Sequence, residues 1–136
     1  MSKVFIAAAK RTPIADFQGS LKTVKPGELG AEVIKNILEE TKVDPAKIDE
    51  VILGNVLSAG HGQNVARQAS LWGGVPQEVP AYGLNMVCGS GMKSVMNAYQ
   101  GVKSGLSNLV IAGGTESMSQ APYLVSGNNR GGVKMG

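Results

Sequence analysis

The sequence is poor in the side chains that build metal sites and disulfides. It has one cysteine and one histidine among 136 residues, which excludes a disulfide within the chain and a cluster of histidine or cysteine ligands. Charge is also sparse. The formal net charge is +3 and the basic residues are scattered, so the sequence predicts no basic patch that could bind a nucleic acid. We therefore expect no metal, no internal disulfide and no nucleic-acid partner.

Long hydrophobic runs are absent as well. No stretch reaches the roughly 20 apolar residues that a membrane-spanning helix needs, and the first residues lack the apolar segment of a signal peptide. A cytoplasmic location without membrane association is the resulting expectation. Aromatic residues make up only 4% of the chain, whereas 43% is hydrophobic and 19 residues are glycine. This balance is typical of a tightly packed α/β domain with short turns.

Apolar runs alternate with helical patterns along the chain. We predict four strands, at residues 4–9, 51–57, 79–85 and 109–112. Between them we predict a helix that begins at Pro26, a short helix capped by Asn64 and a helix that follows Cys88. This alternation favours an α/β fold with a mostly parallel sheet and helices on both faces.

The helix after Cys88 carries an apolar stripe. Met92, Val95, Met96 and Tyr99 recur at helical spacing, so we expect this stripe to be buried. Gly105 lies just past the last turn, where a glycine commonly ends a helix.

Cys88 lies where the third predicted strand ends and this helix begins. Unpaired N–H groups and the positive end of the helix dipole gather there, so a thiolate would be stabilised and an oxyanion could be bound. Gly89 and Gly91 leave room for an acyl group to approach the backbone. The alternative is an inert, buried structural cysteine, because free cysteine is among the most buried residue types. This stretch alone favours neither interpretation.

The same glycines also belong to a run that is similar to a second sequence motif. The run from Gly89 to Ser94 is close to the glycine fingerprint of dinucleotide-binding folds. Ser94 stands where the third glycine is required, and no acidic residue ends a clear second strand at the usual distance, which disfavours a dinucleotide. Ligands of parallel sheets bind beyond the carboxyl ends of the strands. We therefore expect the site among Arg11, residues 57–63, Cys88 and residues 113–118.

Three loop segments occur in a fixed order along the chain. They are Gly54-Asn55-Val56-Leu57 with Gly62-Gln63-Asn64, then Asn85-x-x-Cys88-Gly89-Ser90-Gly91, then Ala112-Gly113-Gly114-x-Glu116-Ser117-Met118-Ser119. With Arg11-Thr12-Pro13 near the start, these segments resemble the amino-terminal part of the thiolase family, in particular its acetyl-CoA C-acetyltransferase type. The resemblance covers essentially the whole chain, but only about the first third of a family member.

The resemblance implies a thiolase-like, five-layer α-β-α-β-α architecture, of which this chain supplies part of the first half. Residues 1–118 would form the amino-terminal domain without its last strand, and residues 119–136 would begin an inserted loop domain. The implied activity is an acyltransferase that reversibly condenses two acetyl-CoA molecules to acetoacetyl-CoA and CoA through an acetyl-cysteine intermediate. The alternatives are a 3-ketoacyl-CoA thiolase of fatty-acid degradation and a non-catalytic fragment that acts only in association.

The resemblance also assigns roles to individual residues. Cys88 would be the nucleophile, and Gln63, Gly89 and Met118 would bind substrate or support the site. The position of His61 varies in the family, and we expect it on the surface of a loop. No cofactor is implied beyond the CoA thioesters that serve as substrates, and the expected partner is a second copy, in a homodimer or homotetramer.

The activating histidine and the second catalytic cysteine of the family lie in carboxyl-terminal Gly-His and Cys-x-Gly motifs that this chain lacks. We therefore expect the isolated chain to be inactive and poorly folded, and mobile from about Ser126 onward.

Overall fold

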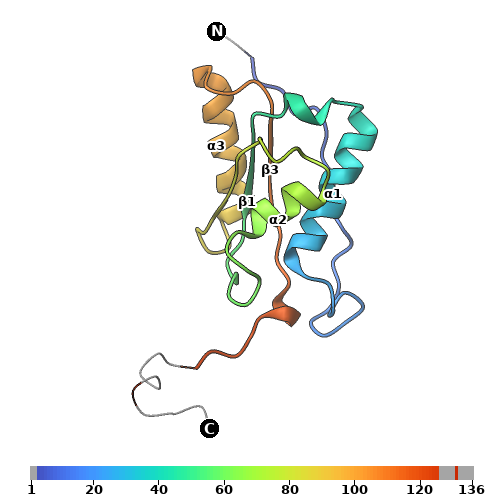
Figure 1. Ribbon diagram of the computed structural model, residues 1–136, viewed down its shortest axis with the longest axis vertical. Helices are drawn as coiled ribbons and strands as arrows, with labels where there is room; N and C mark the ends of the chain where they lie inside the picture. Colours follow the sequence, from blue (N-terminus) through green and yellow to red (C-terminus); the bar gives the residue numbers. More distant parts are fainter. Residues whose placement is uncertain (1–2, 126–130, 132–136) are drawn as a thin grey trace.

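A three-stranded parallel sheet lies at the centre of the fold. The computed structural model describes residues 3–125 and 131 (Figure 1). The strands are β1 (Glu50–Gly54), β2 (Ala81–Leu84) and β3 (Val110–Gly114), in the order β2-β1-β3. Both neighbouring pairs are parallel, which confirms the predicted α/β fold with a parallel sheet.

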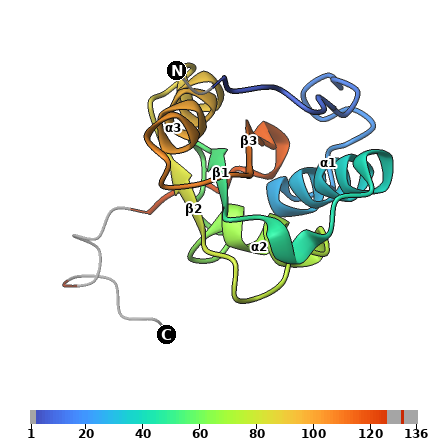
Figure 2. The same ribbon diagram turned by 90° about the horizontal axis from the view of Figure 1, so that it is seen from above.

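Helices cover both faces of this sheet, as predicted (Figure 2). One face packs against α3 (Ser90–Ser104); the other is covered by α1 (Pro26–Thr41) and α2 (Val65–Trp72). Two single turns, Pro45–Lys47 and Met118–Gln120, complete the elements in the described part of the chain. None of its helices is both long and apolar enough to cross a membrane.

The helix ends follow the local sequence signals. Asn64 caps α2, because its side-chain oxygen accepts a hydrogen bond from the Arg67 N–H at 2.9 Å. Gly105 ends α3 in the left-handed conformation, at a φ of 81°. Both signals were predictable because a cap depends on a few neighbouring residues.

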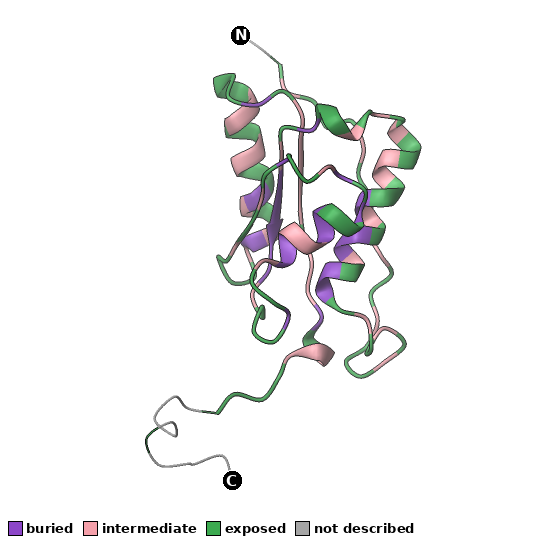
Figure 3. Cartoon of the chain, in the orientation of Figure 1, coloured by how far each residue is buried: buried purple, intermediate pink, exposed green. Residues whose placement is uncertain are grey.

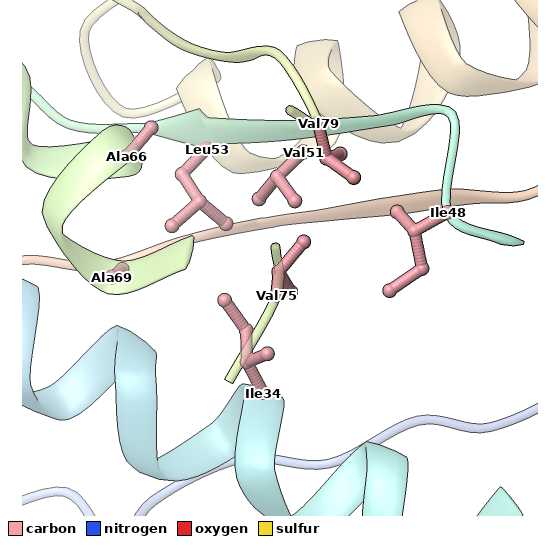
Figure 4. Packing of buried hydrophobic residues seen from close by; sticks show 8 residues of the cluster. All are labelled: Ile34, Ile48, Val51, Leu53, Ala66, Ala69, Val75 and Val79. Atoms are coloured by element: carbon pink, nitrogen blue, oxygen red, sulfur yellow. The ribbon is translucent and has the colours of Figure 1, made fainter. Parts of the chain in front are cut away.

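The main apolar core lies between β1 and the two helices on its face (Figure 4). Val51 and Leu53 of β1 point toward this face and meet Ile34 of α1 and Ala69 of α2 within the cluster. Residues at alternate positions of a strand share a face, so Ile52 and Gly54 belong to the opposite face, where α3 packs. This packing fixes β1 between the two layers and sets where its carboxyl end lies.

The first predicted strand is wrong. Residues 4–9 form no strand, and Phe5 and Ile6 are about four-fifths exposed (79% and 83%). A continuous apolar run becomes a strand only where both of its faces are covered, and the described residues supply no such cover for this segment. The other predicted strands are confirmed in place, with shifted ends. The Asn55 N–H still donates to the Leu84 carbonyl of β2, at 3.1 Å. The pairing ends there, because the Val56 and Leu57 N–H groups bind the Glu116 carboxylate rather than a neighbouring strand.

The predicted burial of the α3 stripe is also wrong. Met92, Met96 and Tyr99 are 67%, 48% and 52% exposed, and the buried residues of α3 are Ser90 and Ser94 (Figure 3). The helix packs its small residues on the sheet, because the strand ends carry glycines that allow a close approach. The apolar stripe therefore faces away from the sheet.

The predicted boundary between residues 118 and 119 stays a prediction. The mobility predicted from Ser126 onward falls almost wholly outside the described residues.

Candidate functional site

The carboxyl ends of β1 and β3 meet the amino-terminal end of α3 with almost no side chain between them. A Cβ atom placed on Gly54 would lie 2.5 Å from the Ser90 carbonyl carbon and 2.6 Å from the Gly91 nitrogen. On the β3 side, a Cβ on Gly114 would lie 3.3 Å from the Gly91 Cα. These glycines let the helix terminus rest directly on the strand ends. The chain just before the helix, including Cys88, is thereby held at the carboxyl edge of the sheet.

A tight turn presents Cys88 at that edge. Val87, the residue before it, has a φ of 51°, in the left-handed region that β-branched residues rarely adopt. The Val87 carbonyl accepts hydrogen bonds from both the N–H and the hydroxyl of Ser90, at 3.1 and 2.6 Å. The Gly89 N–H donates to the Met86 carbonyl at 3.1 Å. Cys88 itself is exposed and carries a free thiol.

Glu116 ties the loop after β3 to the loop after β1. One of its carboxylate oxygens accepts from the Asn55 amide and the other from the Val56 N–H, both at 2.9 Å. The Leu57 N–H donates to the same carboxylate at 3.3 Å. The Asn55 amide also donates to the Thr115 carbonyl at 3.0 Å. Hydrogen bonds to a charged group are stronger than neutral ones, so these bonds hold the two loops in register.

A pocket of about 460 Å³ opens between these loops and the Cys88 turn. Its lining is mostly apolar side chains and backbone: Gly54, Asn55, Val56, Leu57, Val87, Cys88, Ser90, Gly91, Gly114, Thr115, Glu116 and Met118. A site beyond the carboxyl ends of parallel strands is the common position for ligands in such sheets. Cys88 therefore lines a space that could admit a small acyl group.

The predicted site residues differ in how they relate to this pocket. Met118, 64% exposed, lines it together with Cys88. Gly89 lies next to Cys88 as the residue that precedes α3, and a Cβ there would be 2.7 Å from the Met86 side chain. Gln63 is exposed and does not line the pocket. The structure brings Cys88 and Met118 together in the pocket. Gly89 adjoins Cys88 in the chain without lining the pocket, and Gln63 lies outside it.

The expectation that His61 lies on the surface is wrong. The residue is only 9% exposed, and its Nε2 is buried without a hydrogen-bond partner. The backbone accounts for this, because Gly60 and Gly62 on either side both have positive φ and fold the loop inward. The Gln68 amide donates to the His61 carbonyl and fixes the loop to α2. His61 does not line the pocket with Cys88.

Asn55 and Ser90 were parts of the loop segments but had no role in the sequence-based prediction of the site. Glu116 entered that prediction only as a member of the range 113–118, without a role of its own. For Asn55 and Glu116 the available signal was a polar residue within two positions of a buried strand's end, since such residues meet at one edge of a parallel sheet. In the described part of the chain, no three acidic, histidine or cysteine side chains gather closely enough to hold a metal ion.

Comparisons with known proteins agree with this geometry. The family model for the thiolase amino-terminal domain matches residues 4–136. A protein named probable acetyl-CoA acyltransferase from Staphylococcus aureus is 54% identical over all 136 residues, and its counterpart in Staphylococcus epidermidis is also 54% identical. The chain spans 34% of the length of these curated relatives.

A solved structure shows the same fold. The crystal structure of the Bacillus anthracis acetyl-CoA acetyltransferase matches 93% of this chain with a TM-score of 0.84 and 38% identity. The match covers 32% of that protein's chain. The fold, the family model and these relatives lead to one conclusion: the chain belongs to the thiolase family and corresponds to its amino-terminal domain.

Proposed function

We propose that the complete protein containing this chain is an acetyl-CoA C-acetyltransferase that uses Cys88 as its nucleophile. The single observation that carries the proposal is the position of Cys88, at the amino-terminal end of α3 and beside the pocket at the strand ends. Relatives named as acetyl-CoA acyltransferase and acetyltransferase support the choice of acyl group. The substrates would be acetyl-CoA and CoA, with no further cofactor.

The first half-reaction forms an acetyl-cysteine. The Cys88 thiolate attacks the carbonyl carbon of acetyl-CoA, and the bond between that carbon and the CoA sulfur breaks. CoA leaves as a thiol after taking a proton from a general acid. Backbone N–H groups at the start of a helix are suited to stabilise the tetrahedral oxyanion, at about 3 kcal/mol for each good donor. The exposed thiol of Cys88 is accessible to such a substrate.

The second half-reaction forms the carbon–carbon bond. A second acetyl-CoA loses a proton from its methyl group, and the resulting carbanion attacks the acetyl carbonyl on Cys88. The carbon–sulfur bond to Cys88 then breaks, which releases acetoacetyl-CoA and regenerates the thiolate. The two half-reactions together need an acid that protonates the departing CoA and a base that takes the methyl proton. His61 does not line the pocket. We assign both roles to residues outside these 136. General acid–base groups typically contribute about 10²–10⁴-fold each, so turnover depends on those residues.

We also propose that the complete protein is a homodimer, or a tetramer of two such dimers. Supporting this proposal, β2 lies at the edge of the described sheet, so its outer side could pair with the same strand of a second copy. Sedimentation velocity at micromolar concentration tests the assembly, and a single monomeric species would contradict it. A cytoplasmic location remains a prediction.

Thiolysis kinetics test the proposed reaction. We expect the complete protein to cleave acetoacetyl-CoA with CoA and to lose activity as the acyl chain lengthens. A preference for long 3-ketoacyl-CoA substrates would instead identify a degradative thiolase. Absence of turnover and of any Cys88 adduct would leave the non-catalytic alternative.

A further inference from the structure

The backbone just before Cys88 is held in an unfavourable conformation. Val87 has a φ of 51°, and a non-glycine residue in a sparsely populated region costs on the order of 1–3 kcal/mol. Such a conformation persists only where neighbouring interactions enforce it. The turn therefore needs hydrogen bonds that would be lost if Val87 relaxed to an extended or helical φ.

Ser90 provides two of these interactions with one side chain. Its hydroxyl accepts from the Met86 N–H at 2.8 Å and donates to the Val87 carbonyl at 2.6 Å. Ser90 is 4% exposed, and its Cβ lies 2.7 Å from where a Cβ on Gly54 would be, so its side chain is packed closely against the strand end. The hydroxyl thus bonds to both residues that precede Cys88.

Asn85 holds the same turn from the solvent side. Its side-chain oxygen accepts from the Val87 N–H at 2.9 Å. The N–H and the carbonyl of Val87 are therefore both bound by side chains, one from each end of the turn. Asn85 is exposed, so its contribution can be removed without opening the core.

We propose that Ser90 and Asn85 are positioning residues that hold Val87 in its left-handed conformation and so keep the Cys88 thiol at the helix terminus, facing the pocket. This inference rests on the proposed function of Cys88 as nucleophile. If Val87 relaxed, the peptide between it and Cys88 would rotate, which would shift the sulfur relative to the N–H groups at the start of α3. A misplacement of about 1 Å can cost on the order of 10²-fold in rate.

Ser94 offers a matched control on the same helix. It lies one turn later, is fully buried, and its hydroxyl donates to the Gly91 and Gly113 carbonyls at 2.6 Å each, away from the Cys88 turn. Ser90→Ala and Ser94→Ala therefore remove the same group from similarly buried positions. Both should lower thermal stability, but only Ser90→Ala should slow acetylation of Cys88.

The experiment uses the complete protein and follows the peptide containing Cys88 by mass spectrometry after a single turnover with acetyl-CoA. For Ser90→Ala we expect acetylation slowed by at least about tenfold, with kcat lowered and the KM for acetyl-CoA nearly unchanged. Equal acetylation rates in the Ser90→Ala and Ser94→Ala proteins would overturn the proposal.

Asn85 variants keep the proposal testable if Ser90→Ala does not fold. Asn85→Ala should slow acetylation in the same way while leaving thermal stability close to that of the wild type. Asn85→Ser should restore part of the rate, because a serine hydroxyl can also accept from the N–H two residues on. A normal rate for Asn85→Ala, or no rescue by serine, would refute the role of Asn85.

The rate at which iodoacetamide alkylates Cys88 distinguishes failure of this inference from failure of the proposed function. If wild-type Cys88 accepts no acetyl group, the proposed function fails. The relative rates of Cys88 alkylation in the wild-type, Ser90→Ala and Ser94→Ala proteins then still decide the positioning role. A selective change in Ser90→Ala supports it, and equal rates reject it.

Discussion

Replacing Gly54 by alanine should separate α3 from the end of β1. The new Cβ would lie 2.5 Å from the Ser90 carbonyl carbon and 2.6 Å from the Gly91 nitrogen. These are backbone atoms, which cannot rotate away as a flexible side chain can. To reach an ordinary contact of 3.4 Å from 2.5 Å, the helix terminus must withdraw by about 0.9 Å.

Two consequences of this displacement can be estimated. Overpacking of this kind lowers the free energy of unfolding by about 1–3 kcal/mol. The displaced helix terminus carries the Cys88 turn with it, so the acetylation rate of Cys88 should fall by up to about 10²-fold. Gly113→Ala is the control: a Cβ there would lie 3.8 Å from the Leu53 side chain, an ordinary contact. That variant should react like the wild type and be at least as stable.

Urea denaturation of the complete protein measures the first effect, and single-turnover acetylation measures the second. The reasoning predicts that Gly54→Ala is impaired in both and Gly113→Ala in neither. A Gly54→Ala protein with unchanged stability and unchanged acetylation would show that the close approach of β1 to α3 does not position the site.

Further predictions concern single residues around the same framework. Gly101→Ala should raise the free energy of unfolding by about 0.5–1 kcal/mol in thermal or urea unfolding, because this position is within α3 and a Cβ would meet nothing nearer than 3.5 Å. Glu116→Ala should lower the free energy of unfolding by about 1.5–3 kcal/mol, since the substitution removes hydrogen bonds to a charged group. Unchanged stability would contradict the role of Glu116 in holding the two loops in register. Hydrogen bonds from the backbone N–H groups of Asn108 and Leu109 lower the pKa of Asp49 below its ordinary value of 3.8. This carboxylate therefore stabilises the fold fully above pH 3.8 and progressively less as the pH falls below it, so Asp49→Asn should flatten the dependence of stability on pH in that acidic range.

Features set by neighbouring residues could be predicted from the sequence. The Asn64 cap, the helix stop at Gly105 and the buried strand around Ile52 each depend on a short stretch of chain. The place of Cys88, between a strand and a helix, followed from the same local signals. Its position in a pocket followed only from the general rule that ligands bind at the carboxyl ends of parallel strands.

Features set by distant packing could not be predicted. A helical stripe such as Met92, Met96 and Tyr99 shows which side of a helix is apolar, but not whether anything covers it. The sheet selected the opposite, small-residue side of α3 because Gly54 permits a closer approach there. The burial of His61 depends on the positive φ of its two glycine neighbours, which the sequence allows without requiring.

The exposed stripe has a practical consequence for the 136 residues alone. The described residues leave the stripe uncovered, and large exposed apolar patches commonly mark contact surfaces or promote aggregation. We expect residues 1–136 expressed alone to scatter light and to show no thiolysis. A soluble, cooperatively folding and active preparation would refute this expectation.

Direct detection of the acetyl-enzyme is the decisive measurement for the central claim. The complete protein is mixed with acetyl-CoA, quenched in acid and digested, and the peptide containing Cys88 is examined by mass spectrometry. We predict a thioester-linked acetyl group on Cys88 that disappears when CoA is added, and no thiolysis by Cys88→Ala. Full turnover by Cys88→Ala, or an acetyl group carried only by another residue, would contradict the assignment of Cys88 as the nucleophile.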